Sequence, residues 1–589
     1  MARVKTRKPK PDANGTGHKK KSASRRLDPV SLEVARARLE AIVEEMGATL
    51  LRTAHSSIFV ECKDYSVALL ERDGGLVAMG QYIPHHQGGM QAALKSIIAE
   101  KGLETIRPGD IYVTNDPYLG GTHMPDLNMF LPVFAGDELV LWCGSCAHQI
   151  DLGGGAPGAY VVGATEVYQE GICFPCIKAG ENNELYDDFI RLFQRNVRLP
   201  EQQKGDLLAM HGALRVGARN VSALIRENGE GQFIAIVGEI LDGSERRVRQ
   251  EIRDIPDGVY KHTDYLDHDG IDDRLFKMEV TLTIKGSNAT VDFAGTDEQA
   301  QGFINASYWN TVAAVYSAFF LFLDPTIPRN SGFFRPIKIT APLGSILNPR
   351  FPGPIGGSTT EGGGRVYDMV LAALSSARPD RALGTWPMMW LGLFIAGQHP
   401  ETERRYIHVV LDGLATGGGA RTSYDGLNAT HITASNMLIP NIEAEEGEYP
   451  VRFVRRELAT DSGGPGENRG GLALETELII LCDCEFTMFT SRFKGNDADP
   501  LGTQGGMSGS PSDFYKISPD GTVTTYPAKA GRVALHAGDR LVLRPCGGGG
   551  YGDPRARARE RVEEDLRLGF ISPEAAKRDY GYVIEEAAE

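Results

Sequence analysis

The 589-residue sequence has no long apolar run and no nucleotide-binding signature. A membrane-spanning helix needs about 20 consecutive apolar residues, so we expect no transmembrane segment. A phosphate-binding loop of the P-loop type needs a GxxxxGK[ST] motif, and the glycine clusters of this chain do not form one. The sequence therefore predicts no self-contained site for ATP or for a dinucleotide.

Cysteine is also scarce, and eight residues are too few for a disulfide framework in a chain of this length. They include two CxxC pairs, Cys143/Cys146 and Cys173/Cys176, which together could form a four-thiolate zinc site. If the first pair continues a strand from Leu139, Cys143 and Cys146 point to opposite faces of the sheet. We expect reduced cysteines in a cytoplasmic protein, with the zinc site as the alternative.

Positive charge is in deficit, because the formal net charge is -15. This balance argues against a general nucleic-acid-binding protein. Residues 1–26 are the exception and hold ten lysine and arginine residues without an apolar segment, so they are neither a signal peptide nor an anchor. We predict a disordered arm, and the alternative is an electrostatic docking arm for an acidic partner.

The rest of the composition is that of a globular protein, with 41% hydrophobic and 24% charged residues. Asp28-Pro29 predicts the start of a long amphipathic helix that ends near residue 55. Alternation over residues 278–284 and 289–293 predicts strands, as do the apolar runs 472–481 and 532–543. The fold class predicted is mixed α+β. The 70 glycines occur in clusters, which indicates tight turns and close backbone approaches.

The most informative stretch runs from residue 111 to 151. A strand at 111–113 leads into a glycine-containing loop, and strands at 127–134 and 139–142 follow. The ends of these elements carry His123, Asp126 and His148. Two imidazoles and a carboxylate can bind a divalent metal and leave a position open for water or substrate. The alternative is that His123 and Asp126 form a hydrogen-bonded pair within the loop, and that His148 is a histidine at the end of a strand whose hydrogen bonds are made without a metal.

Two segments ahead of this stretch could contribute to the same site. The chain from 59 to 70 and from 76 to 79 predicts a β-hairpin, and either Glu61 or Asp64 could supply a fourth ligand, or be a solvated carboxylate. His85 and His86 precede a helix predicted over 90–101. Adjacent residues in an extended segment face opposite ways, so we expect at most one of these histidines to point into a pocket; otherwise both are solvated.

Several ordered motifs together resemble the B subunit of the hydantoinase/5-oxoprolinase family, which includes the metal-bearing subunit of acetone and acetophenone carboxylases. The longest are residues 115–126 (NDPYLGGTHMPD), 147–151 (AHQID), 330–336 (NSGFFRP), 461–466 (DSGGPG) and 547–554 (GGGGYGDP). The matches run in family order from about residue 28 to the C-terminus. The loop at 359–365 is richer in glycine than this resemblance leads us to expect, so its contacts are left open.

The resemblance implies a metal site made of Asp64, His123, Asp126 and His148, with zinc, manganese or iron as the divalent metal. It also implies a partner subunit of the hydantoinase A type, similar to an actin-fold kinase, which holds the ATP in a hetero-oligomer such as A2B2. The domain organisation that we predict is a basic arm (1–26), an N-terminal metal-site domain (27–257), a β-rich mixed domain (258–550) and a helical tail (551–589). Residues 547–550 are expected to form a hinge into that tail.

The activity expected from the resemblance is ATP-dependent ring opening of a cyclic amide such as a hydantoin, an oxoproline or a lactam. His85 or His86 would act as a general base or orient the substrate. Asp116 and Asp151 would be carboxylates bonded to the ligating imidazoles, and bicarbonate is a candidate co-substrate. The alternatives are an ATP-dependent ketone carboxylase, and a structural subunit without catalytic function.

Overall fold

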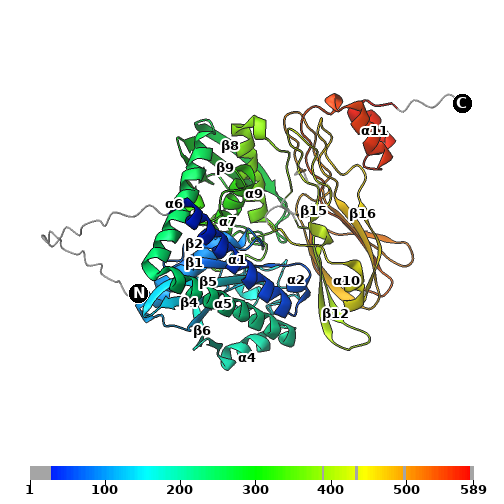
Figure 1. The fold of residues 1–589 in the computed structure, drawn as a ribbon. Coiled ribbons are helices and arrows are strands. Elements are labelled where there is room, and N and C mark those ends of the chain that lie inside the picture. The colour runs from blue at the N-terminus through cyan, green and yellow to red at the C-terminus, as the bar shows by residue number, and fades with distance from the viewer. Residues whose placement is uncertain (1–27, 388–389, 432–434, 495–498, 584–589) are drawn as a thin grey trace, which may run out of the picture.

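The computed structural model describes residues 28–387, 390–431, 435–494 and 499–583, so the predicted basic arm lies outside the described residues. The chain forms two bodies that lie side by side (Figure 1). Helices and several sheets are both present, as the predicted mixed α+β class requires. No helix in the described ranges is long and apolar enough to cross a membrane.

A seven-stranded antiparallel sheet lies at the centre of the first body, in the order β2-β1-β5-β4-β3-β6-β7. The predicted hairpin is confirmed, but residues 57–60 form the short helix α2 (Ser57–Val60) and the strand begins only at Tyr65. The strands are β1 (Tyr65–Glu71), β2 (Leu76–Met79), β3 (Ile111–Thr114), β4 (Asp126–Ala135), β5 (Glu138–His148), β6 (Ile177–Glu181) and β7 (Glu184–Leu185).

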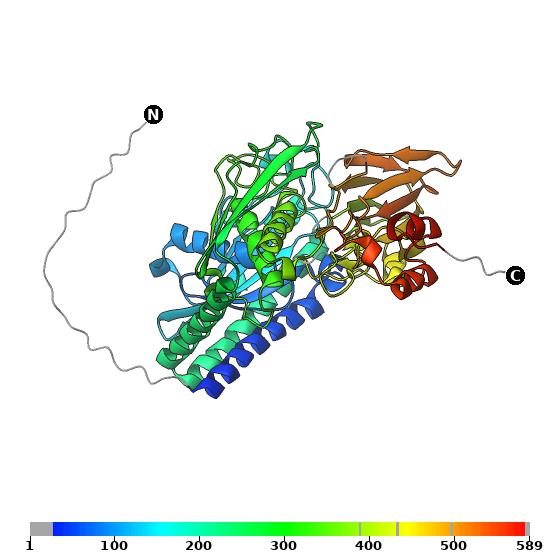
Figure 2. The same ribbon diagram turned by 90° about the horizontal axis from the view of Figure 1, so that it is seen from above.

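Helices cover both faces of this sheet. Helix α5 (Pro200–Asn228) packs on one face, where Gly217 lies against the Cys143 thiol, and α3 (His86–Lys101) packs on the other, where Met90 lies against Gly144. Cys143 and Gly144 are neighbours in β5, so their contacts show the two faces directly. Helices α1 (Pro29–Thr53), α5 and α6 (Glu230–Arg253) lie side by side (Figure 2). α4 (Asp187–Asn196) packs beside α5.

The predicted start of the first helix is confirmed. The Asp28 carboxylate accepts a hydrogen bond from the backbone N–H of Ser31, and Pro29 occupies the first turn. The cap and the proline together fix where α1 begins, because they satisfy one free N–H group and remove another.

A second sheet, in the order β11-β10-β9-β8, completes the first body. Its strands are β8 (Gly258–Leu266), β9 (Phe276–Lys285), β10 (Asn288–Asp292) and β11 (Ile337–Thr340), and its helices are α7 (Tyr308–Phe322), α8 (Ser331–Phe334) and α9 (Gly362–Ala377). Burial alternates along β9, as its sequence predicts. One hydrophobic core continues from α1 across residue 257 and α9 and includes Phe394 and Phe489 of the second body, and a second core begins at Leu391; the domain boundaries stay a prediction.

The described residues of the second body form three further sheets, of orders β13-β12-β18-β21, β14-β15 and β16-β17-β22-β19-β20. Residues 532–543, predicted as one strand, belong to two, because Gly538 (φ +93°) turns the chain between them. The elements are β12 (Gly392–Gln398), β13 (Arg405–Val410), β14 (Ala415–Thr416), β15 (Thr430–His431), α10 (Ile442–Glu448), β16 (Val451–Leu458), β17 (Leu474–Ile480), β18 (Cys484–Phe489), β19 (Asp513–Ile517), β20 (Val523–Thr525), β21 (Lys529–Leu535), β22 (Arg540–Arg544), α11 (Arg559–Arg567) and α12 (Pro573–Ala575).

The glycine clusters of the second body pack backbone against backbone. The N–H of Gly548 donates to the carbonyl of Gly471 (3.0 Å), and the N–H of Gly471 donates to that of Gly418 (2.8 Å). A Cβ atom on Gly548 would lie 2.0 Å from the Gly418 oxygen, so a larger residue does not fit. The hinge predicted at 547–550 is therefore wrong, because this segment is buried and its N–H groups donate to backbone carbonyls of other segments.

Candidate metal centre

The four predicted metal ligands lie at one edge of the seven-stranded sheet. Asp64 precedes β1, Asp126 begins β4 and His148 ends β5. Because β1, β5 and β4 are antiparallel neighbours, these three ends meet at the same edge. Asp126 pairs with His148 across the ladder, and the N–H of His148 donates to the carbonyl of Asp64 (3.1 Å). His123 approaches from the loop that leads into β4.

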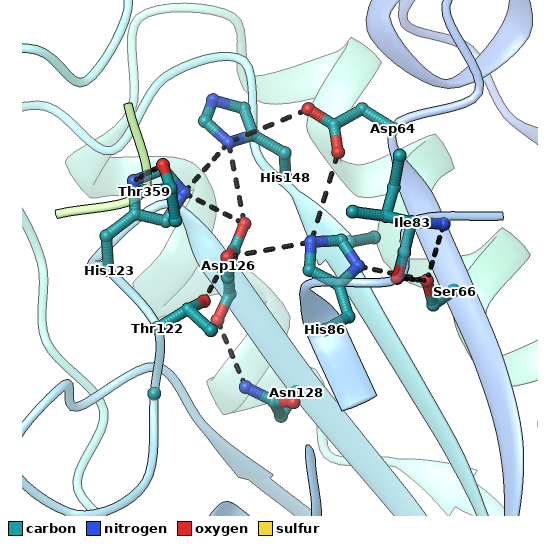
Figure 3. A network of polar contacts seen from close by, with 12 residues as sticks. Asp64, Ser66, Ile83, His86, Thr122, His123, Asp126, Asn128, His148 and Thr359 are labelled. Carbon is teal, nitrogen blue, oxygen red and sulfur yellow. Dashed lines mark hydrogen bonds and ion pairs between the residues drawn. The ribbon is translucent and has the colours of Figure 1, made fainter. Parts of the chain in front are cut away.

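The ligand atoms of three of these residues are spaced as a tetrahedral metal site requires (Figure 3). His123 Nε2 lies 3.0 Å from Asp126 Oδ1 and 3.2 Å from His148 Nδ1, and His148 Nδ1 lies 3.5 Å from Asp126 Oδ1. Ligands at zinc-like bond lengths form a tetrahedron with edges of about 3.3–3.6 Å. Asp64 Oδ2 is next in range, at 4.0 Å from His148 Nδ1.

The tautomer of His123 also fits a cation. His123 Nδ1 lies 3.4 Å from the carbonyl oxygen of Gly356 and 3.3 Å from the hydroxyl of Thr359. A carbonyl can only accept, so Nδ1 carries a proton and Nε2 faces Asp126 Oδ1. Among the described residues, no hydrogen bond to that buried oxygen is formed. Two such acceptor atoms at this distance need a cation between them, either a proton on Nε2 or a metal ion.

The two carboxyl groups differ in their electrostatic setting. Burial raises the pKa of Asp126, but the imidazoles of His123 and His86 outweigh it and hold this pKa well below its ordinary value. Burial raises the pKa of Asp64, against the opposing effect of His148 and His86. Asp126 is therefore the carboxyl group whose ionised form the surrounding imidazoles favour more strongly.

His86 begins α3, four residues before the predicted start of that helix, His85 is the N-cap, and both line the cavity. Only His86 reaches the carboxylates: its Nε2 lies 3.6 Å from Asp126 Oδ2 and 3.9 Å from Asp64 Oδ1. Neither ring nitrogen of His85 has a hydrogen-bond partner within the described part of the chain, and burial lowers its pKa to about 4. We expected at most one of these histidines to point into the pocket. Both line the cavity, but only His86 contacts the carboxylates.

Ser66 fixes the tautomer of His86. The Ser66 hydroxyl donates to the carbonyl of Ile83 (3.1 Å) and accepts from the N–H of the same residue (3.1 Å). Its single proton is used, so the contact of 3.1 Å with His86 Nδ1 is a hydrogen bond donated by the imidazole. Nε2 of His86 consequently faces the cavity.

The cavity that holds these groups has a volume of about 70 Å³. Pockets for drug-sized ligands hold roughly 300–1,000 Å³, so this one has room for water or a small anion beside the side chains. Tyr160 stacks on His148 with ring centroids 5.9 Å apart, and Trp390, next to the first strand of the second body, packs edge-on against Tyr160. The two bodies therefore enclose the site together.

Two predicted support residues lie elsewhere. Asp116 Oδ1 accepts from the N–H of Tyr118 (2.8 Å) within its own turn, and Asp151 binds Arg198 through a carboxylate–guanidinium contact of 2.8 Å. Neither carboxylate contacts an imidazole, so their predicted role beside the ligands is wrong. The Asn-Asp-Pro turn explains Asp116, because an aspartate at such a position bonds the backbone two residues on.

The cysteine pairs do not form a common site. All eight cysteines are free. Cys143 and Cys146 point to opposite faces of β5, as alternation predicts, and Cys146 lies close to His86 and Asp126. Cys146, Ser66, Thr122 and Thr359 also lie at the site, although they were not predicted to belong to it. The CxxC spacing draws attention to Cys146, but no motif in the neighbouring sequence indicates the other three.

A family model described as Hydantoinase B/oxoprolinase matches residues 28–554. The chain belongs to the hydantoinase B/oxoprolinase family. Among the family relatives, the beta subunit of the caprolactamase of Pseudomonas jessenii is 33% identical over 568 residues, which cover 95% of this chain and 97% of that protein. The B subunit of a putative D-/L-hydantoinase of Pseudomonas sp. (strain NS671) is 32% identical over 96% of this chain and 97% of its own length.

Two solved structures show the same architecture. The crystal structure of the ATP-dependent caprolactamase from Pseudomonas jessenii superposes with a TM-score of 0.90 at 31% identity, over 96% of this chain and 98% of that chain. A nucleotide-free acetone carboxylase superposes with a TM-score of 0.89 over 95% and 80% of the two chains. At 20% identity this second likeness shows the fold alone.

Proposed function

We propose that this chain is the metal-bearing subunit of an ATP-dependent enzyme that opens cyclic amides. The observation that carries the proposal is the convergence of Asp64, His123, Asp126 and His148 in one enclosed cavity. The names of the family relatives, a caprolactamase and a hydantoinase, supply the substrate class. A lactam or a hydantoin is therefore the first substrate to test.

The partner in this proposal is a kinase-like subunit of the hydantoinase A type. The relatives are named as beta and B subunits, which supports a complex with another chain. The 5-oxoprolinase of Dictyostelium discoideum is a longer protein, of which the matching part is 41%. The rest of that protein is long enough to contain an ATP site. Because this chain has no nucleotide-binding motif, the proposal places the ATP site in a partner. A hetero-oligomer in the cytoplasm is part of the proposal.

An unstrained amide carbonyl is a poor electrophile, and phosphorylation of its oxygen on the partner makes it a good one. When bound, a zinc, manganese or iron ion supplies Lewis acidity and lowers the pKa of water toward neutrality. Asp64, His123, Asp126 and His148 are the residues that would hold it. Burial behind Tyr160 and Trp390 excludes bulk water and strengthens these electrostatic interactions.

His86 is the residue we propose to accept the proton of the attacking water. Its Nε2 faces the cavity because Ser66 fixes the proton on Nδ1. His85, neutral and without a hydrogen-bond partner, forms part of the cavity wall and would orient the ligand. Bicarbonate, which is small enough for a cavity of about 70 Å³, is the co-substrate that we propose.

The test is to purify the chain together with its ATP-holding partner and to measure ring opening of caprolactam, hydantoin and 5-oxoproline by mass spectrometry. ATP-dependent opening of one of these, abolished in Asp126→Ala and retained in the buried control His211→Ala, supports the proposal. Incorporation of labelled bicarbonate into a ketone instead would make the complex a carboxylase. Full activity in Asp126→Ala would make this chain a structural subunit.

A further inference from the structure

We propose that the cavity binds two divalent transition-metal ions, with the second held by His86, Asp126 and Cys146. This inference rests on the metal centre of the proposed function and adds a second position to it; with that position filled, His86 is a ligand of the second ion in place of a general base. Two sets of three buried residues place ligand atoms within 4.8 Å of one another, one with His123 and His148 and one with His86 and Cys146. Asp126 belongs to both sets.

Asp126 directs one oxygen toward each set (Figure 3). Its Oδ1 lies 3.0 Å from His123 Nε2, and its Oδ2 lies 3.6 Å from His86 Nε2. Thr122 also donates to Oδ2. A carboxylate oxygen has two lone pairs, so this hydrogen bond leaves one of them for a metal. A carboxylate with an oxygen on each side is the group that bridges paired metal ions.

Asp64 repeats this arrangement on the other side of the cavity. Its Oδ2 lies 4.0 Å from His148 Nδ1, and its Oδ1 lies 3.9 Å from His86 Nε2. Two carboxylates thus lie between the pair His123/His148 and the residue His86. Paired ions about 3.5–4 Å apart, as found in two-metal enzymes, fit between such groups.

The tautomer of His86 supplies an independent argument for a cation. With its Nδ1 proton donated to Ser66, Nε2 of His86 faces two carboxylates in a buried setting. A cation at this position, either a proton on Nε2 or a metal ion, balances the charge of the carboxylates. An imidazole held by a hydrogen bond at one nitrogen is the usual arrangement of a metal ligand.

Cys146 completes the second set from the neighbouring strand. It stands two residues before His148 in β5 and opposite Asn128 in β4, so it faces the same side of the sheet as His148. Its side chain is buried. A thiolate ligand selects zinc, iron or cobalt over magnesium and calcium. Two such ions would bind two oxygen atoms of one small anion.

The test uses the chain purified with its partner, stripped by a chelator and titrated with Co²⁺. We expect two equivalents per chain in the wild type, together with a thiolate-to-cobalt charge-transfer band in the near ultraviolet. His86→Ala and Cys146→Ser should each bind one equivalent and lose this band. Cys143→Ser, in the same strand but on the opposite face, and His211→Ala should behave as the wild type.

One equivalent in the wild type, retained in His86→Ala and lost in His148→Ala, would overturn the second position and leave the proposed function intact. No cobalt binding at all would overturn both. A measurement without variants covers the case of misfolding: two Co²⁺ ions bridged by Asp64 and Asp126 give an exchange-coupled paramagnetic resonance spectrum, and a spectrum of isolated ions only would contradict the proposal.

Discussion

Asp126 and His148 stand opposite each other in the β4–β5 ladder, with Asp126 Oδ1 3.5 Å from His148 Nδ1. Their spacing is set by backbone pairing rather than by a flexible loop. The same ladder places Asp64 beside them, since the N–H of His148 bonds the carbonyl of Asp64. The site is thus held in place by the sheet itself, and residues that orient its imidazoles should affect function without affecting the fold.

Ser66 provides such a case. Replacing it with alanine removes the acceptor of the His86 Nδ1 proton and frees the ring to turn. We expect kcat/KM to fall roughly 10- to 100-fold, the usual cost of losing a partner of a site imidazole, together with a loss of about 1–3 kcal/mol of stability, because the buried N–H and C=O groups of Ile83 lose their partner. Ser145→Ala is the matched control, because this buried serine of the adjacent strand has no hydrogen-bond partner for its hydroxyl. Equal effects of the two substitutions would show that the His86 contact is irrelevant.

Glu170 should make stability depend on pH. Its buried carboxylate accepts from the N–H groups of Ile355 (2.9 Å) and Gly356 (2.5 Å), and burial raises its pKa to about 8. A raised pKa means that the folded state holds this proton more tightly than the unfolded state. The stabilisation is present below the unfolded pKa, about 4.3 for glutamate, and is lost as the pH rises toward 8.

We therefore expect the melting temperature of the wild type to fall more between pH 5 and pH 8 than that of Glu170→Gln, measured by scanning calorimetry. The comparison between the two proteins removes the contribution of other titrating groups. Parallel pH profiles would show that Glu170 titrates normally.

The ion pair between Glu361 and Lys529 links the two bodies. Lys529 Nζ lies 3.1 Å from Glu361 Oε2, and both side chains are fully buried. Removing one partner leaves an uncompensated buried charge, which costs about 3–5 kcal/mol. Lys529→Met and Glu361→Gln should each destabilise the protein, and the double variant should recover most of that loss. Chemical unfolding of the four proteins checks this, and strictly additive losses would mean that the pair is not coupled.

The sequence predicted the elements whose signals are local. The cap at Asp28, the alternation in β9 and the CxxC geometry in β5 each depend on residues that are close together in the sequence. The cluster of candidate ligands could also be located, because three strand ends carry His and Asp residues where apolar runs stop. Its four members were assigned through the family resemblance, since spacing alone left the alternative of hydrogen-bonded loop residues open.

What the sequence did not indicate depends on contacts between distant segments. Thr359 and Gly356 lie more than 200 residues from His123, yet both contact its Nδ1. The segment 547–550 read as a hinge because glycine clusters also mark flexible joints, whereas here they permit backbones to pack directly. Asp116 lies in the stretch that carries the candidate ligands, but its carboxylate accepts a hydrogen bond within its own turn.

Metal analysis of the purified protein tests the central claim most directly. Wild type, His123→Ala, Asp126→Ala and the control His211→Ala should be prepared without exposure to chelator and measured by elemental analysis. We predict one or two equivalents of zinc, manganese or iron per chain in the wild type and in His211→Ala, loss of at least one equivalent in His123→Ala, and loss of all bound metal in Asp126→Ala. A wild type without metal, or an unchanged metal content in Asp126→Ala, would contradict the account.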